Sequence, residues 1–134
     1  MKRLSAALLV YLGLASAALA QQAVVVPATT AQVAIAGTVA ASTKIVSGAV
    51  GKSIYVTSIL QIPLATAVVT YTAGTGTNCG TNTVSLTGAM TFAAGQIINM
   101  GNGYGAVLVL PQGTDLCITI ATAAAPGSLA YSLF

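Results

Sequence analysis

Residues 74–88 read GTGTNCGTNTVSLTG, a run of Gly, Thr, Asn and Ser with two aliphatic residues and no charge. This stretch holds Cys79, one of only two cysteines, and the other is Cys117 in the apolar segment DLCITIATA. Because the N-terminus has the pattern of an exported protein, a disulfide is favoured over two free thiols. Such a bridge would join the 74–88 loop to a C-terminal strand and stabilise the fold by about 4 kcal/mol on a loop-entropy estimate.

Short apolar segments rich in β-branched residues lie on both sides of this loop. The clearest, residues 52–62 (KSIYVTSILQI), alternates with a period of two and stops at Pro63, as a strand does. Gly-, Pro- and Asn-rich turns separate the segments, and the Asn-Gly pair in GNGYG (101–105) is a hairpin signal. The other expected strands are residues 32–39, 43–47, 65–72, 82–86, 89–92, 96–100, 106–110, 116–121 and 128–134.

These segments, some of them interrupted, amount to about eight short strands at the spacing typical of an all-β sandwich or barrel. We expect an antiparallel β-sandwich over residues 31–134, jelly-roll-like rather than immunoglobulin-like. An immunoglobulin domain usually carries a Trp between its cysteines, and this chain has no Trp. No segment beyond residue 21 keeps the apolar spacing of a helix.

The N-terminus has the three parts of a secretory signal. A basic pair is followed by an apolar run, residues 4–17, and by an A-x-A motif that ends at Ala20. We expect residues 1–20 to be a signal peptide cleaved after Ala20, or else a retained apolar helix that anchors the chain. If it is retained, a membrane would be contacted only through residues 4–20. Residues 21–30 (QQAVVVPATT) are expected to be a linker or a docking arm that pairs as an edge strand.

The composition argues against some partners and for others. Of the 134 residues, 56% are hydrophobic and only 4% are charged, against about 25% charged in ordinary soluble domains. So few surface charges favour a subunit covered by copies of itself or by partner proteins. Beyond the basic pair at the N-terminus, the only cations are Lys44 and Lys52. Two lysines do not make a phosphate-binding patch, so nucleic acid is not an expected partner.

The chain lacks the residues that most enzymes use. It contains no His, and Asp115 is its single carboxylate side chain, so neither a Ser-His-Asp triad nor a pair of catalytic carboxylates is available. One carboxylate without His does not complete a metal site, and no nucleotide-binding motif is present. Asp115 follows a Pro/Gly turn and is expected to bond to nearby backbone. We therefore expect no enzymatic activity, no cofactor and no bound metal.

The Gly-rich turn at 101–105 is the best candidate for contact with a partner. Tyr104 is the one aromatic side chain placed in a turn, where it would be available to a protein or a glycan, and Asn102 lies beside it. The alternative is a tyrosine that packs on its own hairpin. The other tyrosines of the mature chain lie in expected strands and are assigned to the core or to an interface.

Two long segments carry a resemblance to a known group of proteins. They are TYTAGTGTNCGTNTVSLTGAMTFAAG (70–95) and GNGYGAVLVLPQGTDLCITIATAAAPGSLAYSLF (101–134). The chain from about residue 45 onwards resembles small β-rich proteins of tailed bacteriophages that form head decorations or fibre-like virion components. The shared features are GTGTNCGT, the LTGA and GNG turns, a Pro/Gly turn before DLC, and a terminal GSLAY strand. The signal-like N-terminus departs from that pattern.

The resemblance implies a jelly-roll-like module that assembles, often as trimers, on a virion surface. We accordingly expect a non-enzymatic structural subunit, a capsid decoration or fibre-like protein that contacts itself and the major capsid protein or another virion protein. The self-contacts would be made by apolar and Thr-rich faces. The signal-like N-terminus keeps open an alternative, a secreted or periplasmic bacterial module for binding or adhesion.

Overall fold

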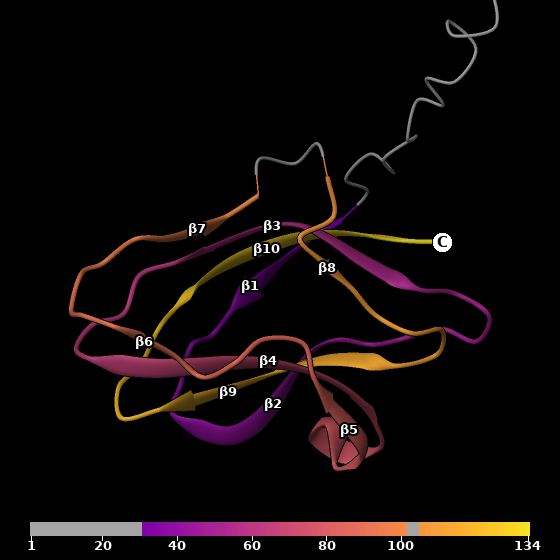
Figure 1. Ribbon diagram of the computed structural model, residues 1–134, viewed down its shortest axis with the longest axis horizontal. Helices are drawn as coiled ribbons and strands as arrows, with labels where there is room; N and C mark the ends of the chain where they lie inside the picture. Colours follow the sequence, from indigo (N-terminus) through magenta and orange to yellow (C-terminus); the bar gives the residue numbers. More distant parts are fainter. Residues whose placement is uncertain (1–30, 102–104) are drawn as a thin grey trace, which may run out of the picture.

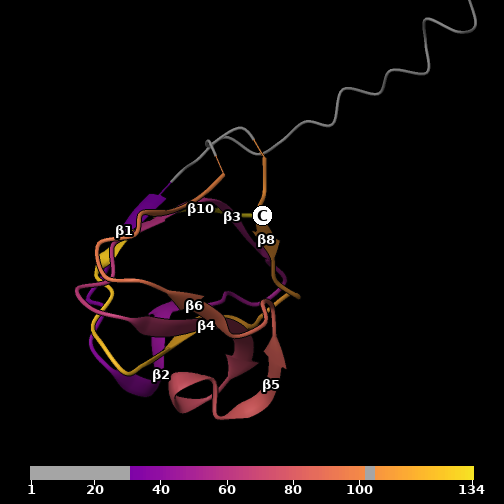
Figure 2. The same ribbon diagram turned by 60° about the vertical axis from the view of Figure 1, so that its left-hand side comes forward.

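The computed structural model describes residues 31–101 and 105–134, and the fold is a sandwich of two antiparallel sheets (Figures 1 and 2). The all-β prediction is confirmed. The elements are β1 (Ala31–Ile35), β2 (Ala40–Val46), β3 (Ile54–Gln61), β4 (Ala67–Thr75), the short 3-10 helix η2 (Thr77–Cys79), β5 (Thr81–Ser85), β6 (Met90–Phe92), β7 (Ile98–Met100), β8 (Leu108–Val109), β9 (Asp115–Ala121) and β10 (Gly127–Leu133). The predictions for residues 1–30 and for Asn102 and Tyr104 fall outside the described residues.

Each sheet has five strands, and the chain passes repeatedly from one sheet to the other. In sheet A the order is β1-β10-β3, followed by β7 and β8, which both pair with β3. In sheet B the order is β2-β9-β4, followed by β5 and β6, which both pair with β4. In each sheet a strand from the C-terminal part of the chain, β10 or β9, lies between two strands from the N-terminal part. Neither sheet can therefore form before the N-terminal and C-terminal parts of the chain meet.

The core lies between the sheets and is built by alternation. In β4, for example, Ala67, Val69, Tyr71 and Ala73 are almost fully buried and point inward, as a period of two requires. Aliphatic residues of both sheets complete one continuous core: Ile35, Val46, Ile54, Val56, Ile59, Ile98, Leu110, Leu116, Ile118, Ile120, Ala125 and Leu129.

A buried polar link crosses this core. The Tyr71 hydroxyl, on sheet B, donates a short hydrogen bond to the Gln61 side-chain carbonyl on sheet A. The Gln61 amide in turn donates to the Ala125 carbonyl at 2.8 Å, so the turn between β9 and β10 is tied to the same pair. Both side chains are fully buried, and the link fixes how the two sheets sit against each other.

Some strands differ from the prediction. The apolar stretch AVLVL (106–110) reads as one continuous strand, but only Leu108–Val109 forms the regular β8. Val107 and Leu110 still donate backbone hydrogen bonds to β3, at 2.7 and 2.9 Å, so the segment follows β3 without forming an uninterrupted ladder. By contrast, β4 is longer at its C-terminal end than the expected strand 65–72. It extends to Thr75 and so includes the first two residues of the 74–88 stretch.

Candidate functional site

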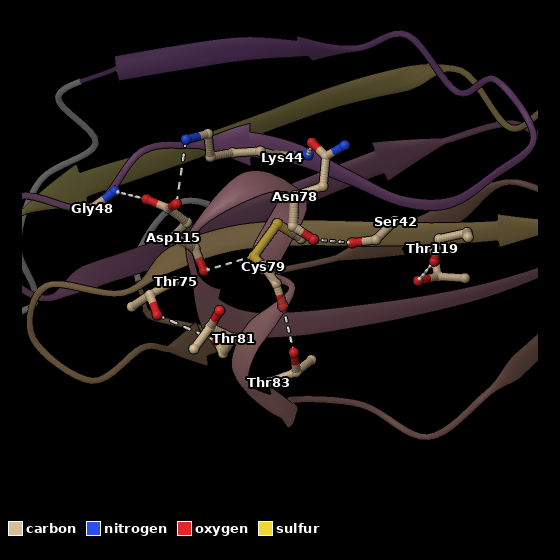
Figure 3. Close-up of a disulfide and its surroundings, with 12 residues drawn as sticks. Ser42, Lys44, Gly48, Thr75, Asn78, Cys79, Thr81, Thr83, Asp115 and Thr119 are labelled. Atoms are coloured by element: carbon tan, nitrogen blue, oxygen red, sulfur yellow. Dashed lines mark hydrogen bonds and ion pairs between the residues drawn. A yellow bond between two sulfur atoms is a disulfide. The ribbon is translucent and has the colours of Figure 1, made fainter.

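The 74–88 stretch folds over the outer face of sheet B, where it is held by the disulfide (Figure 3). After β4, Gly76 turns the chain with a φ of 76°, and Asn78 and Cys79 follow in the left-handed region at 50° and 57°. The tight turn places Cys79 over β9, where it is bonded to Cys117 with the two Cα atoms 6.2 Å apart. We call residues 76–80 the flap. The predicted pairing of the two cysteines is thus present in the structure.

Asn78 extends the flap to a third strand. Its backbone carbonyl accepts a hydrogen bond from the Ser42 hydroxyl at 2.7 Å, and its side-chain carbonyl accepts one from the backbone N–H of Lys44 at 3.3 Å. The flap therefore starts at β4, crosses β9 and is attached to β2. On the near side, the Thr83 hydroxyl donates to the Cys79 carbonyl. An Asn directly before Cys79 is a usable signal for this geometry, since Asn tolerates positive φ better than most residues.

Asp115 joins the ends of β2 and β9, which corrects the prediction that it bonds nearby backbone. One carboxylate oxygen accepts a hydrogen bond from the backbone N–H of Gly48 at 2.8 Å, and the other lies 3.3 Å from the Lys44 ammonium. Because Gly48 is 67 residues away in sequence, the partner was out of reach of a local rule. The pair is partly exposed, so its contribution to stability is small.

Gly74 lies under the flap, and its missing side chain makes room for it. A Cβ atom there would come within 2.8 Å of the Cys79 Cβ and 2.9 Å of the Cys79 carbonyl oxygen. We expect Gly74→Ala to lower the free energy of unfolding by about 1–3 kcal/mol, because the flap must shift away from sheet B. Gly88→Ala is the matched control, since a Cβ there meets nothing within 4 Å. Chemical denaturation of both variants checks this, and equal stabilities would contradict it.

A second feature lies at the β2 edge of the same sheet, the edge that the flap reaches through Asn78. Between β1 of sheet A and β2 of sheet B, the sandwich opens into a groove of about 220 Å³. Its lining is mainly aliphatic, with Val33 and Ile35 from β1, Ile45 from β2, and Ile118 and Ile120 from β9. Polar side chains at its margin are those of Thr38, Thr43 and Lys44, and Lys44 is paired with Asp115. Its volume lies below the roughly 300–1,000 Å³ of small-molecule sites, so it suits a few aliphatic side chains better than a ligand. Sequence patterns missed this groove because three separate strands form it.

The titratable and metal-ligating side chains of the described residues are few and mostly engaged in structural contacts. Within 31–101 and 105–134, no three His, Cys, Asp or Glu side chains gather where a metal ion could bind. Both cysteines are used in the disulfide. Burial raises the pKa of the Tyr71 phenol, which keeps it protonated as a hydrogen-bond donor to Gln61. Within the same residues, no helix has the length and hydropathy that crossing a membrane requires.

Comparison with protein families, with characterised proteins and with solved structures finds no match for this chain. Its two distinctive places are the flap on sheet B and the groove between β1 and β2. The predicted contact residues Tyr104 and Asn102 and the predicted cleavage position Ala20 lie outside the residues described.

Proposed function

We propose that the protein is a non-enzymatic structural subunit that assembles with copies of itself on the surface of a virion. The observation that carries this proposal is an exposed apolar patch on a surface that is almost free of charge. The proposed partners are other copies, often as trimers, and the major capsid protein or another virion protein. Nucleic acid is not among them.

The apolar patch consists of Leu60, Ile62, Leu64 and Ile97. Leu60 and Ile62 flank the buried Gln61, and alternation therefore turns both of them to the outside of sheet A. Ile97 comes beside them because β7 pairs with the end of β3, Ile98 opposite Gln61. Leu64 and Ile97 are 69% and 64% exposed, and the backbone hydrogen bond from Gly95 to the Pro63 carbonyl holds their two turns together. Clustered exposed aliphatic side chains mark interaction sites.

The charges of the described part do not offset this patch. Lys44 and Asp115 pair with each other. Within the described ranges, 31–101 and 105–134, the other charged side chain is that of Lys52. A free monomer would have little electrostatic repulsion to keep it from its neighbours. Self-association removes the patch from water without burying unpaired charge, which makes it the favoured state of such a surface.

The strand order supports the jelly-roll part of the proposal. If β5 and β6 are taken as one position, and β7 and β8 as another, sheet A reads positions 1-8-3-6 and sheet B reads 2-7-4-5. Every connection between consecutive positions then passes from one sheet to the other, except that from position 4 to position 5, which stays within sheet B. Such crossing between two sheets is typical of the double-sheet jelly roll used by capsid and lectin domains. The resemblance of the chain to head-decoration and fibre-like phage proteins supports placing it on a virion.

A second candidate is a secreted or periplasmic module for binding or adhesion, and the disulfide favours it. Disulfides persist in oxidising compartments, and both cysteines are buried in the bridge. Together with the signal-like N-terminus, this fits a chain that folds after export. The intact mass of the protein from its natural source separates the two: a start at Gln21 supports export, whereas an intact Met1 supports assembly in the cytoplasm.

Charged substitutions test the patch. We expect Leu60→Lys combined with Ile97→Lys to reduce the assembly to single subunits, because the introduced ammonium groups would lose their hydration in the interface. Val50→Lys is the matched control, since Val50 is 99% exposed and lies in the turn before β3, at the other end of that strand. Light scattering gives the mass of each. Assembly that survives the double substitution would contradict the role of the patch.

A further inference from the structure

We infer that residues 22–26 of a neighbouring copy add a strand to the free edge of β1 and place their side chains in the groove between β1 and β2. The inference rests on the proposed self-assembly and names the segment that makes one of its contacts. It follows from three things: the groove, the unprotected edge beside it, and the chemistry of the chain that precedes β1.

The groove exposes the interior of the sandwich. Ile35, Ile118 and Ile120 line it, yet each is nearly inaccessible, so the groove reaches down to core side chains. Val33 is half-buried on the β1 side and Ile45 on the β2 side. An extended chain along β1 would lay every second side chain over these residues and complete the core at that edge.

Among the described strands, β1 has the one edge without the usual protection. It pairs with β10 alone, over five consecutive residues with no shift in register, and its sequence AQVAI holds neither charge nor proline. Such an edge is a template for another strand. Three residues of this strand, Val33, Ala34 and Ile35, line the groove.

The other edges are blocked or short. At the edge of sheet B, the pairing of β2 shifts in register twice, β2 carries Lys44, and Asn78 of the flap occupies a backbone N–H there. β5 is interrupted by a register shift. β6, β7 and β8 have only three, three and two residues. Bulges, charge and short length are the ways in which proteins prevent strand addition, so the contrast with β1 singles out that edge.

The residues before β1 have the composition of a strand that could pair with the free edge of β1. QAVVV (22–26) has five residues, as β1 does, with no charge and three β-branched valines, and Pro27 follows. The connection to β1, residues 27–30, reads PATT. Because the proposed function is assembly with copies of the same chain, we assign the segment to the β1 edge of a neighbouring copy, and the peptide experiment below separates this from pairing with its own β1.

Alternation provides the test. In an extended strand Val24 and Val26 face one way and Ala23 and Val25 the other, so only one pair enters the groove. Two full-length double variants are compared with wild type, Val24→Asp with Val26→Asp and Ala23→Asp with Val25→Asp. We expect one of them to weaken self-association at least about tenfold and the other to change it by less than about threefold. A carboxylate loses its hydration only in the groove, and Lys44, the one cation in the lining, is already paired with Asp115. Sedimentation measures both.

Each outcome decides something. Equal effects of the two variants, or none, would overturn strand insertion while leaving assembly through the apolar patch in place. A wild-type chain that stays a single subunit would overturn the proposed function itself. A synthetic peptide of residues 21–30 gives an independent readout: we expect it to bind the chain that lacks residues 22–26 and to dissociate wild-type assemblies when in excess. If it binds only the shortened chain and wild type is a single subunit, the segment occupies its own β1 and the inference is wrong.

Discussion

Replacement of both cysteines, Cys79→Ala with Cys117→Ala, is expected to lower the free energy of unfolding by about 4 kcal/mol. The bridge closes a loop of 38 residues that runs from the flap to the middle of sheet B, so its removal restores much conformational freedom to the unfolded chain. It is also the one covalent hold on the flap, whose remaining attachments are the Asn78 and Thr83 hydrogen bonds. Without the bridge, the strained left-handed turn is free to relax.

Chemical denaturation with and without reducing agent checks this expectation. Reduced wild type should be close in stability to the double variant, and reducing agent should have no effect on the variant. Equal stabilities of oxidised wild type and the double variant would contradict the structural role of the bridge. Because stabilities of native domains are about 5–15 kcal/mol, the loss amounts to a large share of the total.

The second large effect is expected at the link between the sheets. Tyr71→Phe removes the hydroxyl that donates to Gln61 and leaves a buried carbonyl oxygen without this donor, which should lower the free energy of unfolding by about 1–3 kcal/mol. Tyr55→Phe is the matched control: Tyr55 is a half-buried strand tyrosine whose ring packs edge-on against Phe134 at a centroid distance of 6.1 Å. Its change should be within about 0.5 kcal/mol. Equal losses would contradict the role of the link.

The same tyrosine predicts the behaviour at high pH. Burial raises the pKa of the folded Tyr71 phenol, whereas in the unfolded chain it ionises near its ordinary value of about 10. Its contribution to stability is therefore complete below pH 10 and declines as pH rises further, because only the unfolded state releases the proton. Wild type should lose stability above pH 10 more steeply than Tyr71→Phe does. Parallel pH profiles of the two would argue against a buried, protonated phenol.

Local patterns predicted much of the fold, because strands and turns have local sequence signatures. A pair of cysteines in a chain with a signal-like N-terminus likewise indicates a disulfide. The alternation in 52–62 and the stop at Pro63 correspond to β3, Ile54–Gln61. Asn78 and Cys79 were recognisable as part of a turn, and only Cys117 offered Cys79 a partner. The exact length of a strand was less predictable: AVLVL is apolar enough for one, but its hydrogen bonds to β3 are irregular.

Contacts between distant residues account for what was missed. Asp115 bonds to Gly48 and Lys44, which lie in a different part of the chain, and the Tyr71–Gln61 link joins two sheets. The groove between β1 and β2 arises only when the two sheets are stacked, and no single segment encodes it. The apolar patch also depends on contacts between distant residues. Ile97 precedes β7, and it comes beside Leu60 and Ile62 only because β7 pairs with β3.

The most direct test of the central claim is the mass of the wild-type protein in solution, measured by light scattering over a range of concentrations. A self-assembling subunit should give a defined multiple of the mass of one chain, and dilution should lower it only as the subunits dissociate. A single-chain mass at every concentration, in a folded and soluble protein, would contradict the claim that the surface of this sandwich, with very few charges, is covered by copies of the same chain.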